Sequence, residues 1–102
     1  GRAVKVIKGI VNDFNIPVIA GSQLNRLSEY RADPRPKLSD LRETGDIEQD
    51  ADNVILLHRD KEESPNILEC KIAKGRQTGD FPSVRLLWLP DKRKYVDYIE
   101  KI

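Results

Sequence analysis

The sequence predicts an α/β fold in which parallel strands are followed by carboxyl-terminal β-hairpins. Apolar residues between Ala3 and Phe14 recur at helical spacing, which predicts an amphipathic helix. This segment leads directly into PVIA at 17–20, a continuously apolar run typical of parallel strands covered on both faces. After residue 66 the sequence alternates between polar and apolar residues in short runs, and this pattern indicates hairpins.

Local signals place the boundaries of the first elements. Asn15 suits the end of the first helix, because asparagine tolerates the left-handed conformation found there. Residues 27–37 are expected to form a long loop, since Pro34 and Pro36 exclude helix. The chain must therefore cross a considerable distance before its next regular element.

The second half of the chain contains short helices and then strands. Ser39 can cap a short helix over 40–44 that Gly45 stops, and a further helical turn can follow over 46–50. The expected strands are the continuously apolar NVILLH at 53–58, the alternating ILECKIAK at 67–74, VRLLWL at 84–89 and KYVDYI at 94–99.

Composition limits the classes of function. The 102 residues amount to one domain at most or part of a larger one, and the net charge of +1 is unlike that of a dedicated nucleic-acid module. No apolar window is long enough to span a membrane. The single Cys70 cannot form an internal disulfide, which fits a reducing, cytoplasmic setting. Cations are nevertheless concentrated in RADPRPK at 31–37 and KIAKGR at 71–76.

Four stretches in a fixed order carry a specific resemblance. PVIAGSQLNR, RADPRPKLSDLRETGDIEQDAD, a strand ending in HRD and KGRQTG closely resemble the carboxyl-terminal part of bacterial replicative DNA helicases of the DnaB type. The resemblance implies that residues 1–102 are the carboxyl-terminal portion of a RecA-like P-loop ATPase domain. Members of this family are expected to work as homohexameric rings that pull single-stranded DNA through a channel as ATP is hydrolysed.

The first candidate site residue is Gln23, which follows the expected strand at 17–20. Ligands of open α/β sheets bind beyond the carboxyl ends of the strands, where an amide can hydrogen-bond a γ-phosphate. The resemblance implies that Gln23 is the sensor of the γ-phosphate. The competing interpretation is a glutamine that only caps backbone groups.

The second candidate site lies around the short helix at 40–44. The resemblance implies that Arg42, Glu43 and Gly45 belong to a loop that follows the DNA backbone and contacts phosphates without reading sequence. The acidic residues at 46–52 are expected to point away or to pair with cations of a neighbouring subunit. Without the resemblance, Arg42 would be read as a partner of nearby acids.

The third candidate site comprises Lys74 and Arg76 at the tip of a hairpin, on one face of the extended chain with Gly75 between them. The resemblance implies that this element reaches the ATP of the next protomer, with Arg76 as the arginine finger and Lys74 near the γ-phosphate. A solvated hairpin with scattered cations is the alternative interpretation.

The catalytic parts of a P-loop ATPase are missing from this sequence. It contains no Gly-Lys-Ser/Thr phosphate loop, and we read Asp60 as a strand-end cap rather than a magnesium-binding Walker B residue. We expect the Walker A and Walker B segments and the catalytic glutamate upstream of Gly1. The chain alone should therefore bind no metal and hydrolyse no ATP, although the complete family member uses ATP and Mg²⁺.

Three hypotheses follow. The leading one is a segment of a replicative helicase whose partners are single-stranded DNA and neighbouring subunits, with primase and a helicase loader as candidate partners and no membrane. The second is a stand-alone, non-enzymatic protein that binds DNA or a helicase. The third is another RecA-like ATPase, such as a recombinase or clock-type protein.

Overall fold

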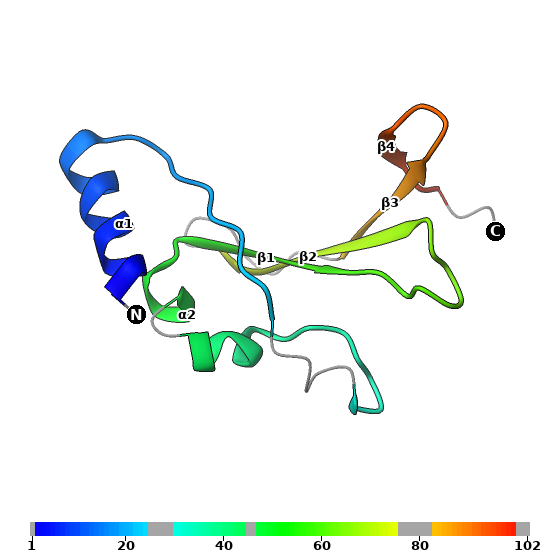
Figure 1. The fold of residues 1–102 in the computed structure, drawn as a ribbon, viewed down its shortest axis with the longest axis horizontal. Helices are drawn as coiled ribbons and strands as arrows, with labels where there is room; N and C mark the ends of the chain where they lie inside the picture. Colours follow the sequence, from blue (N-terminus) through cyan, green and yellow to red (C-terminus); the bar gives the residue numbers. More distant parts are fainter. Residues whose placement is uncertain (1, 25–29, 45–46, 76–82, 100–102) are drawn as a thin grey trace.

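The computed structural model describes residues 2–24, 30–44, 47–75 and 83–99 (Figure 1). Helical elements occupy the first half of the chain and a sheet the second. Their order is α1 (Arg2–Phe14), the 3₁₀ helix η2 (Leu38–Thr44), α2 (Ile47–Asp50), β1 (Asn53–His58), β2 (Ile67–Gly75), β3 (Val84–Leu89) and β4 (Lys94–Asp97). None of the helices in this part of the chain has the length and apolar character needed to cross a membrane.

Helix α1 forms where the periodicity predicts it. Asn15 follows the helix with a positive φ of 52°, the left-handed conformation expected of a residue that ends a helix. The Lys8 ammonium pairs with Asp52 at 3.2 Å and so links α1 to the segment before β1. Asp52 therefore has a cationic partner within its own chain, whereas the sequence led us to expect one on a neighbouring subunit.

The segment after α1 differs from the expectation. Residues 16–24 form no strand, and the structure shows them as an open link (Figure 1). Ile16 and Val18 are exposed, and Ile19 is fully exposed. An apolar segment becomes a buried strand only when neighbouring strands satisfy its backbone, and no described segment pairs with this one.

The four strands form an antiparallel meander in the order β1-β2-β3-β4, which confirms the predicted hairpins. The continuously apolar sequence of β1 led us to expect burial on both faces, but its burial alternates. Val54 and Leu56 are buried, whereas Ile55 and Leu57 are more than half exposed. The difference arises because the described helices cover only one face of β1.

The core lies between η2 and β1. Its buried side chains among the described residues are Leu41 of η2 and Val54 and Leu56 of β1. Partly buried residues surround them, namely Leu24, Leu38, Ile47, Ala51 and Ala73. This cluster fixes η2 and α2 against the sheet.

The start of η2 is closed by a different residue from the one expected. The Asp40 carboxylate accepts the Lys37 N–H at 2.8 Å, and the Asp40 N–H donates to the Lys37 carbonyl at 2.9 Å. Asp40, and not Ser39, therefore caps this helix. The helix is also of the tighter 3₁₀ type, a form that proteins use in short pieces.

We predict that Leu41→Ala lowers the free energy of unfolding by about 2–5 kcal/mol, because it leaves a cavity in the core. Leu57→Ala is the matched control, since the Leu57 side chain is largely exposed, and it should change stability by less than about 1 kcal/mol. Urea unfolding followed by circular dichroism measures both values. Equal effects of the two substitutions would contradict the placement of the core.

We also predict that the 102-residue chain self-associates. Ile19, Ile55 and Leu57 are exposed, and β1 lies at the edge of the sheet, so its free backbone groups can pair with another strand. Sedimentation velocity should show assemblies that grow with concentration. Ile55→Lys should weaken them because a charge on the exposed face opposes stacking. A monomer at every concentration would refute this expectation.

Candidate functional site

Gln23 lies near the end of the open link and is exposed. Its neighbour Leu24 packs against the core, which anchors this end of the link while Gln23 faces solvent. The Ser22 hydroxyl donates to the Gln23 carbonyl at 3.5 Å. In the described part of the chain no group hydrogen-bonds the Gln23 side-chain amide, so the interpretation of Gln23 as a backbone cap gains no support.

The candidate DNA-contacting residues extend from η2. The backbones of Arg42 and Glu43 belong to this helix and directly follow the buried Leu41. The predicted third member, Gly45, lies outside the described residues, as does the predicted arginine finger Arg76. The position of η2 on the core therefore determines where this candidate site begins.

Lys74 connects the hairpin to the helical elements. It lies near the end of β2, opposite Val54 in the register of the sheet. Its ammonium donates to the Gln49 carbonyl of α2 at 3.1 Å. The strand that leads to the predicted finger is thus bonded to the helix that follows the predicted DNA loop.

A network of charged groups, which sequence reasoning missed, surrounds residues 31–37. The two terminal nitrogens of Arg31 bind the two carboxylate oxygens of Asp40 at 2.7 and 2.9 Å. This parallel fork is the strong geometry of an arginine–carboxylate pair. The Arg31 guanidinium and the Lys37 N–H lower the pKa of Asp40 to about 2. Arg31 also donates to the Arg35 carbonyl at 2.9 Å.

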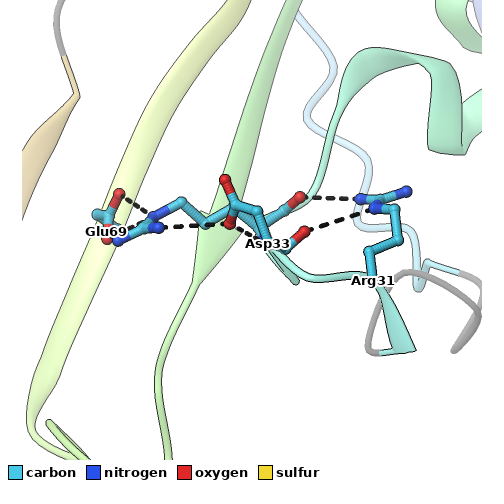
Figure 2. A network of polar contacts seen from close by, with 4 residues as sticks. Arg31, Asp33 and Glu69 are labelled. Carbon is cyan, nitrogen blue, oxygen red and sulfur yellow. Dashed lines mark hydrogen bonds and ion pairs between the residues drawn. The ribbon is translucent and has the colours of Figure 1, made fainter.

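The second half of the network reaches the sheet. The Nε of Arg35 donates to both Glu69 oxygens, at 3.0 and 3.2 Å, and Glu69 belongs to β2. Arg35 also contacts Asp33, through its backbone N–H at 3.1 Å and its Nη1 at 3.3 Å. Figure 2 shows Arg31 and Glu69 at opposite ends of this network, with Asp33 between them. Hydrogen bonds to Glu69 raise the pKa of Arg35.

A signal for this network was present in the sequence. Asp33 and Asp40 are interspersed with the cations of 31–37, so local pairing was available. The contact with Glu69 had no such signal, because it joins residues that are 34 positions apart. The cations of this segment are therefore largely committed to structural contacts.

A groove of mixed charge lies beside the network. Its lining consists of Asp33, Arg35, Pro36, Lys37, Leu56, His58, Glu69, Lys71 and Ser83. Two carboxylates and several cations face the same space, so the groove has no single sign of charge that would select an anion or a cation.

The residues present do not fit ATP and Mg²⁺ as a complete site. The Oδ1 of Asp60 accepts the N–H groups of Glu62 and Glu63 at 3.1 and 3.0 Å, which confirms its role as a cap and lowers its pKa. Within the described ranges, no cluster of three or more potential metal ligands occurs. We therefore derive no hydrolytic step from this chain alone.

The Asp40 contacts predict a dependence of stability on acid. An unfolded aspartate has a pKa of about 3.9, whereas that of folded Asp40 is about 2. Its contribution is therefore complete above about pH 4 and lost as the pH falls towards 2. Across this window, wild-type stability should fall more steeply than that of Asp40→Asn in urea unfolding. Asp91→Asn, in an exposed turn, is the control, and parallel curves for wild type and Asp40→Asn would contradict the prediction.

Comparison with known proteins places this geometry in a family. The family described as the DnaB-like helicase C-terminal domain matches residues 2–97. The replicative helicase DnaB of Geobacillus stearothermophilus is 44% identical over 96 residues, which cover 89% of this chain and 21% of that protein. A probable replicative DNA helicase of Trieres chinensis is 45% identical over 98% of this chain and 24% of its own length.

A solved structure supports the same assignment. The ATPase domain of a helicase matches 96% of this chain and 36% of its own chain, with a TM-score of 0.83 and 40% sequence identity. This match confirms the predicted fold class as part of a RecA-like α/β ATPase fold. The chain spans only about a fifth to a quarter of the length of its curated relatives. With both comparisons in agreement, the chain belongs to the family of DnaB-like helicase C-terminal domains.

Proposed function

We propose that this chain forms part of the ATPase domain of a homohexameric replicative helicase, which couples ATP hydrolysis to movement along single-stranded DNA and to duplex unwinding. Residues 1–102 are its carboxyl-terminal portion. The family match over residues 2–97 supports this function. The bond from Lys74 to the Gln49 carbonyl carries the geometric argument, because it joins the predicted nucleotide-facing hairpin to the helix after the predicted DNA loop.

Each candidate residue has a role in this proposal. Gln23 senses the γ-phosphate from its own protomer, and its exposed position supports this role. Arg42, Glu43 and Gly45 contact the DNA backbone. Lys74 and Arg76 act on the nucleotide of the neighbouring protomer. ATP with Mg²⁺ supplies the reaction's free energy in the complete protein, in sites to which this chain contributes only some polar groups.

The proposed partners follow from the same assignment. Single-stranded DNA and identical neighbouring subunits are the principal ones, and primase and a helicase loader are further candidates. We propose that the complete protein works in the cytoplasm. The alternative of a stand-alone, non-enzymatic binding protein is not favoured, since the relatives are named as replicative helicases.

The experiment uses the full-length protein encoded by the reading frame that contains these residues. Arg76→Ala should lower DNA-stimulated ATP hydrolysis by roughly a thousandfold or more, because an arginine finger offsets charge in phosphoryl transfer. Lys92→Ala, which removes a cation from an exposed turn, is the matched control and should retain wild-type activity.

Mixed rings test whether the finger acts between subunits. When wild-type and Arg76→Ala subunits are combined, activity should fall out of proportion to the fraction of variant, because each defective finger silences a neighbouring site. Full activity of the Arg76→Ala ring would overturn the proposed role. An absence of DNA-stimulated hydrolysis in the wild-type protein would overturn the proposed function.

A further inference from the structure

The 31–37 loop joins η2 to the sheet through charged contacts. At one end, Asp40 of η2 receives the fork from Arg31 and the N–H of Lys37, so both carboxylate oxygens are occupied. The Asp40 side chain is only 13% exposed, which strengthens these contacts relative to a solvated pair. The first turn of η2 is therefore bound to the loop.

At its other end, the loop is bound to the middle of the sheet. Arg35 holds both oxygens of Glu69. Glu69 lies in β2 between His58 of β1 and Arg85 of β3, in a fixed register. Arg31 connects the two ends, because the nitrogen that binds Asp40 Oδ2 also donates to the Arg35 carbonyl. A continuous chain of contacts thus runs from η2 to β2.

These contacts matter because η2 cannot fix its own orientation. It is a 3₁₀ helix of seven residues, a form too short to be stable by itself. Leu41 holds it to the core, but a single apolar contact permits rotation about the anchor. The fork at Asp40, next to Leu41 in sequence, supplies the second fixed point that rotation would break.

We propose that Arg31 is a positioning residue that acts through Asp40 to hold η2, and the DNA-contacting residues it carries, in the orientation that meets single-stranded DNA. This inference rests on the proposed function for the assignment of Arg42 and Glu43. Arg31 itself does not contact the DNA, because its guanidinium is committed to Asp40 and to two carbonyls of the loop.

The salt dependence of binding separates positioning from direct contact. Removal of one protein–phosphate interaction reduces the slope of log affinity against log salt concentration by about 1. In the full-length protein, Arg31→Ala should weaken binding to a fluorescent oligothymidylate roughly tenfold, the equivalent of about one charge-assisted hydrogen bond. Its slope should equal that of the wild type, because every interaction with a phosphate is retained.

Three variants complete the test. Asp40→Asn removes the charge that Arg31 binds without changing side-chain volume, and it should weaken binding to a similar extent. The Arg31→Ala, Asp40→Asn double variant should be no weaker than the single variants, because both act through one contact. Lys61→Ala removes a cation from an exposed turn and should leave affinity and slope unchanged.

The outcomes distinguish this inference from the proposed function. If the wild-type protein binds the oligonucleotide and Arg31→Ala either retains its affinity or shows a slope reduced by about one unit, the positioning role is overturned. Additive effects in the double variant would overturn it as well. If the wild-type protein shows no salt-dependent binding, the proposed function fails first. Size-exclusion chromatography and circular dichroism identify variants that no longer assemble, and Asp40→Asn then decides.

Discussion

The packing of Leu41 against Val54 and Leu56 is the contact on which the arrangement of this chain depends. It joins the helical half to the sheet, and no other buried cluster occurs among the described residues. Every candidate group in the first half is placed by reference to it. Leu24 packs on this core beside Gln23, and Leu41 directly precedes Arg42. A small apolar contact therefore determines the positions of two sites whose chemistry is polar.

Charged groups then refine what the core begins. Burial is non-directional, so it can hold η2 against β1 without fixing its rotation. The fork between Arg31 and Asp40 and the bond from Lys74 to Gln49 are directional, and they bind η2 and α2 from two different segments of the chain. A count of lysines and arginines in this chain overstates its DNA-binding surface, because several of these cations already have intrachain partners.

The same arrangement provides a route by which a signal could pass between two ligands. β2 bears Glu69 at one point and Lys74 near its end, so the strand contacts the 31–37 loop and α2. A shift of the hairpin, where the nucleotide-facing groups are proposed, would be transmitted to the elements on both sides of the proposed DNA loop. Such coupling requires elements that move as units, which a paired strand provides more readily than a loop.

Elements with local signals could be predicted without coordinates. The spacing of apolar residues predicted α1, Asn15 marked its end, and the alternation after residue 66 predicted the hairpins, because each depends on neighbouring residues. The longest motifs identified the family. Three further outcomes required the folded chain: PVIA at 17–20 remains unpaired, β1 is buried on one face, and Arg35 binds Glu69. These outcomes depend on which distant segments cover a strand or present a carboxylate, and no local pattern encodes that choice.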